Sequence, residues 1–127
     1  MTTLLVGVGG AIGSILRYWA GGLVQQAAGG AAAFPAGTLL VNVIGCVAIG
    51  AVAQLAEQRS SLGADARVFL MVGLLGGFTT FSAFANETMT AWRSGAVLMA
   101  GVNVVLSVGA CLAGVAAGRA AIAAFVK

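Results

Sequence analysis

Four long apolar stretches, separated by short polar segments, occupy almost all of this chain. They cover about residues 3–26, 36–56, 68–92 and 95–123. An α-helix needs roughly 20 such residues to cross the hydrocarbon layer of a bilayer. Only 7% of the residues are charged, against about a quarter in a typical water-soluble domain. The sequence therefore predicts an all-α integral membrane protein, with residues 1–127 forming a single four-helix transmembrane domain embedded in a lipid bilayer.

The charged residues are few and scattered along the chain. The net charge is +3, and no run of basic residues suggests a nucleic-acid partner. Four spans place both termini on one side of the membrane. That side receives most of the basic residues, namely Arg59, Arg67, Arg119 and Lys127. Because basic residues favour the cytoplasmic side, the pattern mildly favours cytoplasmic termini.

The third stretch has an unusual middle. From Gly73 to Ser82 it reads GLLGGFTTFS, in which three glycines and two adjacent threonines disfavour an uninterrupted helix. We predict a break near residues 76–81, with Thr80 or Ser82 capping the second half. Backbone groups released inside a membrane must find partners in protein, water or ions, so such breaks accompany ion sites. A continuous helix whose glycines permit close packing is the alternative, and composition does not decide between them.

Neutral polar side chains lie within the apolar stretches. Thr38 and Asn42 share a helical face, and so do Asn103 and Ser107, because each pair is four residues apart. Amide and hydroxyl donors can replace the water around an anion, and phenyl rings offer positive edges. The alternative is that these groups bond helices to one another. The third stretch adds Thr79, Thr80, Ser82, Asn86 and Glu87, with Phe78, Phe81 and Phe84 spaced three apart.

Other residue patterns argue against catalysis. The chain has no histidine, and we find no paired carboxylates and no nucleophile with a base, so we do not expect an enzyme. Cys46 and Cys111 fall within apolar stretches, and we interpret them as packing residues. Arg17 is a cation deep in the first stretch. It either biases the local potential or extends its charged end toward the interface.

Three segments together resemble the CrcB/Fluc family of fluoride channels. Residues 9–18 read GGAIGSILRY, residues 37–45 read GTLLVNVIG, and residues 76–84 read GGFTTFSAF. They occur in the family's order on the first three spans. The resemblance implies a passive, fluoride-selective channel of the cell inner (plasma) membrane that protects against fluoride toxicity. It also implies an antiparallel, dual-topology dimer with two pores along the subunit interface.

The resemblance also implies roles for individual residues. It implies a structural sodium ion at the dimer interface, bound by the backbone carbonyls of Gly76 and Thr79. The fourth span departs from the family pattern, because Asn103 stands where a tyrosine is expected and Cys111 where a serine or threonine is expected. The side chains that match the family's fluoride pore are Asn42, Phe81, Phe84, Ser107, Thr80, Ser82 and Arg17.

Three alternatives stay open at this stage. The dimer could pair the chain with an oppositely oriented paralogue, although a homodimer is the first expectation. A proton-coupled small multidrug exporter would need a membrane-embedded carboxylate, for which Glu87 is the candidate. A scaffold subunit that transports nothing would be supported only by glycine-rich packing faces.

Overall fold

The chain folds into helices that are long and apolar enough to cross a membrane. A computed structural model describes residues 1–31, 33–58 and 62–125, so Arg59 and Lys127 of the charge argument lie outside the described residues. Four such spans occur within this part, and it contains no strand, which confirms the all-α membrane fold. In chain order the helices are α1 (Thr2–Ala27), α2 (Ala36–Gln58), α3 (Ala64–Arg67), the π-helical segment η1 (Val68–Leu75), α4 (Gly76–Phe78), α5 (Phe81–Arg93) and α6 (Val97–Phe125).

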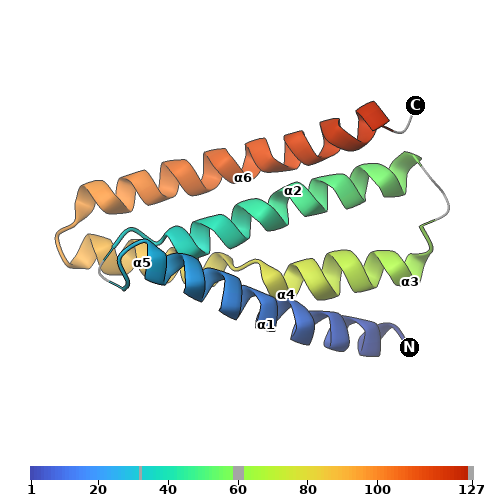
Figure 1. The fold of residues 1–127 in the computed structure, drawn as a ribbon, viewed down its shortest axis with the longest axis horizontal. Helices are drawn as coiled ribbons and strands as arrows, with labels where there is room; N and C mark the ends of the chain where they lie inside the picture. Colours follow the sequence, from blue (N-terminus) through green and yellow to red (C-terminus); the bar gives the residue numbers. More distant parts are fainter. Residues whose placement is uncertain (32, 59–61, 126–127) are drawn as a thin grey trace.

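The spans run alternately up and down, so both termini lie at the same end of the molecule (Figure 1). α2 packs along α6, while α1 packs against η1, α4 and α2. Glycine makes the α1–η1 contact possible. A Cβ atom built on Gly9 would lie only 2.9 Å from the Leu74 amide nitrogen. Small residues thus bring these backbones together where larger side chains would separate them.

The third span is interrupted, as the sequence predicted. Helix α4 ends at Phe78, and Thr79 (φ −92°, ψ 157°) and Thr80 (φ −151°, ψ 111°) are extended before α5 begins. The Thr80 hydroxyl caps α5 by accepting a hydrogen bond from the Ala83 amide at 3.2 Å. The alternative of a continuous helix is therefore wrong. Of the two predicted caps, Thr80 fills the role, and the Ser82 hydroxyl lies 3.2 Å from the Thr80 hydroxyl.

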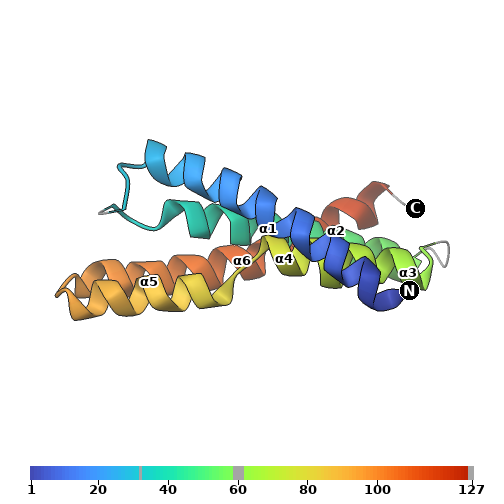
Figure 2. The ribbon, with the colours of Figure 1, turned by 90° about the horizontal axis from the view of Figure 1, so that it is seen from below.

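The break changes the neighbours of the third span. Before it, η1 and α4 pack mainly against α1, and after it, α5 packs against α6. Figure 2 shows the extended connection between α4 and α5, and the α1–α2 pair diverging from the α5–α6 pair at the end opposite the termini. A cavity of about 600 Å³ lies between the α1–α2 connection and the α5–α6 pair at this end.

Gln25 organises the connection between α1 and α2. Its Nε2 donates to the carbonyls of Gly30 at 2.6 Å and Phe34 at 3.1 Å, and its Oε1 accepts from the Gly37 amide at 3.1 Å. The Gly37 amide belongs to the first turn of α2, where no carbonyl within the helix is available to it. One side chain thus fixes the connection and caps the next helix.

Replacing Gln25 with Ala is expected to destabilise the protein by about 1–3 kcal/mol, because it leaves the Gly37 amide and two carbonyls without these partners. Thermal unfolding in detergent, followed by circular dichroism, measures the effect as a lower midpoint. The matched control is Gln26→Ala, since the neighbouring Gln26 is exposed. Equal midpoints for Gln25→Ala and the unmodified protein would show that these bonds do not stabilise the fold.

Candidate functional site

A second cavity, of about 380 Å³, lies beside the break in the third span and is bordered by α2, the third span and α6. The backbone of Gly76 and Thr79 lies at the same place, whereas Ser82 and Arg17 are not part of the lining. The structure therefore brings most of the predicted site into one space. The predicted pore residues that line it are Asn42, Thr80, Phe81, Phe84 and Ser107.

Asn42 stabilises the break in the third span through two hydrogen bonds to the Thr80 backbone. Its Oδ1 accepts from the Thr80 amide at 2.7 Å, and its Nδ2 donates to the Thr80 carbonyl at 3.0 Å. The side chain thereby satisfies both backbone groups of an extended residue inside the membrane, where water cannot do so. An amide NH₂ has two hydrogens, so one remains beyond the bond to Thr80. Asn42 can therefore both stabilise the break and donate to a ligand in the cavity.

The two phenylalanines next to the break have different environments. Their ring centroids are 5.3 Å apart with an interplanar angle of 53°. The Phe84 ring is buried, with 8% of its surface exposed, while Phe81 is 77% exposed on the outside of the chain. Both rings line the cavity. Tilted rings can direct their electropositive edges toward an anion.

The polar residues of α6 connect to α5. Asn103 and Ser107 are buried, at 2% and 7% exposed. The Ser107 hydroxyl donates to Asn103 Oδ1 at 3.2 Å, and Asn103 Nδ2 donates to the Thr88 hydroxyl at 2.8 Å. Thr88 in turn donates to the Phe84 carbonyl at 2.8 Å. The interpretation of these groups as bonds between helices therefore holds for Asn103, and Thr88 is a participant that sequence reasoning missed.

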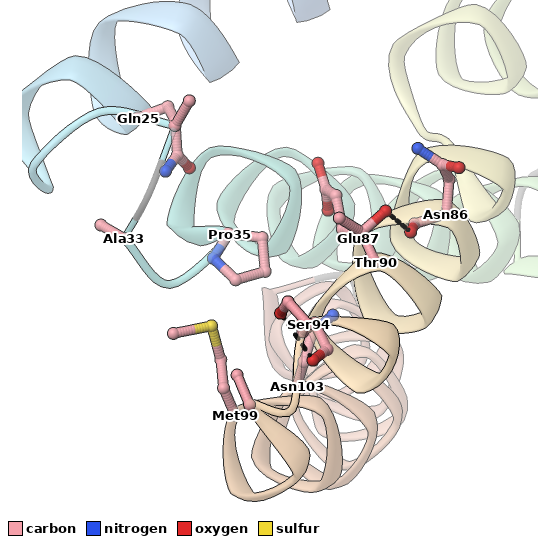
Figure 3. A pocket seen from close by; sticks show the side chains of 12 residues that line it. Gln25, Ala33, Pro35, Asn86, Glu87, Thr90, Ser94, Met99 and Asn103 are labelled. Carbon is pink, nitrogen blue, oxygen red and sulfur yellow. Dashed lines mark hydrogen bonds between the residues drawn. The ribbon is translucent and has the colours of Figure 1, made fainter.

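The larger cavity at the end of the molecule is also polar (Figure 3). Its lining includes Gln25 from α1, Asn86 and Glu87 from α5, and Asn103 from α6. Glu87 Oε1 accepts from the Thr38 hydroxyl at 2.6 Å. Glu87 Oε2 is buried and has no hydrogen-bond partner among the described residues. Asn103 lines this cavity and bonds to Ser107 of the smaller one, so hydrogen bonds link the walls of the two spaces.

Arg17 lies at the break but outside the smaller cavity. Its Nε donates to the Gly77 carbonyl at 3.1 Å, and the Ser14 hydroxyl approaches the same oxygen at 3.5 Å. In a continuous helix the Phe81 amide would bond this carbonyl. Arg17 therefore has an internal partner in the membrane and is not simply extended toward the interface.

The carbonyls of Gly76 and Thr79 fit a hard cation. In an uninterrupted helix they would accept from the amides of Thr80 and Ala83. Those amides instead donate to the side chains of Asn42 and Thr80. Unwound backbone carbonyls of this kind bind sodium in broken transmembrane helices. Within the described residues, His, Cys, Asp and Glu form no cluster of three that could hold a metal.

The chain is similar to known proteins over nearly its whole length. Residues 4–119 match the family described as CrcB-like protein, Camphor Resistance (CrcB). A protein of Rhodospirillum rubrum named fluoride-specific ion channel FluC is 50% identical over 117 residues, which cover 91% of this chain and 89% of the relative. A protein of the same name from Rhizobium leguminosarum bv. trifolii is 47% identical, covering 92% of each chain. Another, from Rhizobium etli, is 45% identical over 97% of each.

Proposed function

Because the chain belongs to the CrcB family, we propose that it is a fluoride-selective ion channel, through which fluoride leaves the cell passively and without an energy source. Such export protects the cell against fluoride toxicity. The observation that supports this most directly is the cavity at the break, where neutral donors and phenyl rings gather around Asn42. The chain is a multi-pass membrane protein, and we place it in the inner membrane.

Selectivity would arise from exchanging water for fixed donors. Fluoride is a small, strongly hydrated anion, so it enters a protein only where other donors replace its water shell. The free N–H of Asn42 Nδ2, the Ser107 hydroxyl after rotation, and the edges of Phe81 and Phe84 can supply such contacts in the smaller cavity. Neutral donors bind the ion without the strong attraction of a cation, so the ion can also leave.

The larger cavity supplies an entrance for this path. Its polar side chains surround a space at one end of the bundle, and the Asn103–Ser107 hydrogen bond joins it to the smaller cavity. Glu87 is the carboxylate of this cavity, and its Oε1 is held by Thr38. A proton-coupled multidrug exporter would depend on such a carboxylate, but the family relationship does not favour that alternative. We infer that the protein catalyses no reaction.

A second copy of the chain would complete the site. Phe81 lines the cavity yet is 77% exposed, so in one chain the cavity has an open side. We propose an antiparallel homodimer in which the partner covers Phe81 and two pores form. The carbonyls of Gly76 and Thr79 from both copies would then hold a sodium ion between them. The positive charge of a bound sodium would favour an anion nearby.

The test is fluoride efflux from proteoliposomes that contain the purified protein. With a fluoride-selective electrode, vesicles loaded with potassium fluoride should empty rapidly once valinomycin balances the charge. Vesicles loaded with potassium chloride should retain their contents, and protein-free vesicles give the background leak. Equal release of fluoride and chloride would overturn the selectivity. No release above the leak would overturn the channel itself.

A further inference from the structure

The two cysteines of the chain line the same cavity, Cys46 from α2 and Cys111 from α6, which pack against each other. Cys46 follows Asn42 by one helical turn, and Cys111 follows Ser107 by one turn. The helices approach closely here, since a Cβ atom built on Gly114 would lie 3.4 Å from the Cys46 Cβ. Both thiols are free and partly buried.

The thiols also face the cavity at the break. Cys46 and Cys111 both line the space of about 380 Å³ that contains Asn42, Phe84 and Ser107. Cysteine inside a membrane helix is usually a packing residue. Here, however, two cysteines from different helices line the same open space. A pair in this position can act together on a ligand that enters the cavity.

We propose that Cys46 and Cys111 form a binding site for one soft divalent cation, such as Cd²⁺, and that the bound cation obstructs the cavity. Thiolates are the ligands that soft metals prefer. On binding, each thiol releases its proton to water, and two sulfur–metal bonds form. Two thiolates and one divalent cation make a neutral unit, whereas a monovalent cation would leave a net negative charge that is costly in an apolar surrounding.

The binding step can be tested without transport. Cd²⁺ added to the purified protein in detergent should produce the ultraviolet charge-transfer absorption of a cadmium–thiolate complex, saturating at one Cd²⁺ per chain. Since the chain has only two cysteines, Cys46→Ser with Cys111→Ser provides a thiol-free control of nearly the same size. Each single replacement should weaken Cd²⁺ binding by about tenfold or more. Even the loss of a residue that only hydrogen-bonds to a metal ligand lowers metal affinity by at least about tenfold.

The obstruction step rests on the proposed channel function. Cd²⁺ should slow fluoride efflux from proteoliposomes containing the unmodified protein, and the chelator EDTA should restore it. Efflux through the thiol-free variant, relative to its own rate without Cd²⁺, should be insensitive to the metal. A protein that moves no fluoride would still show the absorption band, so failure of the channel function and failure of the site are distinguishable.

Three results would overturn the proposal. Absence of the cadmium–thiolate band in the unmodified protein would show that the thiols do not form a site. Equal bands for both single variants and the unmodified protein would show that the thiols do not act as a pair. Saturated binding with unchanged fluoride efflux would show that the cation does not obstruct the path.

Discussion

Replacing Asn42 with Ala is expected to remove most of the fluoride efflux, a loss of about a hundredfold. The substitution deletes both hydrogen bonds to the Thr80 backbone and leaves an amide and a carbonyl without these partners. Each unsatisfied buried group costs about 1–3 kcal/mol. The extended conformation at the break therefore loses its support, and the lining of the cavity is displaced. The initial rate of efflux from proteoliposomes, at equal amounts of incorporated protein, measures the effect.

Two further variants separate the roles of Asn42. Asn42→Asp keeps an oxygen that can accept from the Thr80 amide, but it places a negative charge beside the permeating anion, so efflux should also fall. Leu40→Ala on the same helix is the control, because Leu40 is 39% exposed and does not line the cavity. Gel filtration of each variant reports on folding. An Asn42→Ala protein that elutes normally and conducts at the unmodified rate would contradict the role of this residue.

The place of the break could be predicted from the local sequence, although composition alone left a continuous helix open. Glycines and adjacent threonines have low helix propensity, and the break occurs at the two threonines, Thr79 and Thr80, inside the predicted range, while the glycines before them remain helical. The partner of the break could not be predicted in this way. Asn42 bonds to Thr80 from 38 positions away in the sequence, and only the packing of α2 against the third span brings them together.

The difference between local sequence patterns and contacts made by helix packing also explains which hydrogen bonds around the site were not predicted. Four-residue spacing placed Asn103 and Ser107 on one face, and the Ser107–Asn103 hydrogen bond follows from that spacing. Thr88 belongs to another helix, and no pattern within α6 identifies it as the partner of Asn103. Arg17 reaches the Gly77 carbonyl across 60 positions for a similar reason. The π-helical hydrogen bonding of Val68–Leu75 had no signal in the sequence.

The phenylalanines at the break provide the second large expected effect. Phe84→Ile and Phe81→Ile should each reduce fluoride efflux by about two- to tenfold, if a ring edge stabilises the anion by roughly the 0.5–1.5 kcal/mol of a favourable aromatic pair. Isoleucine keeps much of the bulk but lacks an electropositive ring edge. The Phe84 ring is buried within one chain, so its place in the cavity wall does not depend on the partner. Phe81 is exposed in one chain, so its contribution should depend on the partner that covers it.

Comparing the single and double variants separates ring chemistry from a general loss of structure. The two rings lie 5.3 Å apart, and the effects of residues in contact are not additive, so the double variant should lose less than the product of the single losses. Phe125→Ile, at an exposed position near the end of α6, is the matched control and should conduct normally. Chemical cross-linking in vesicles should show the same dimer for every variant. If both break-site variants conduct at the unmodified rate, the phenyl edges do not contact fluoride, and the path must be assigned to Asn42 and Ser107 alone.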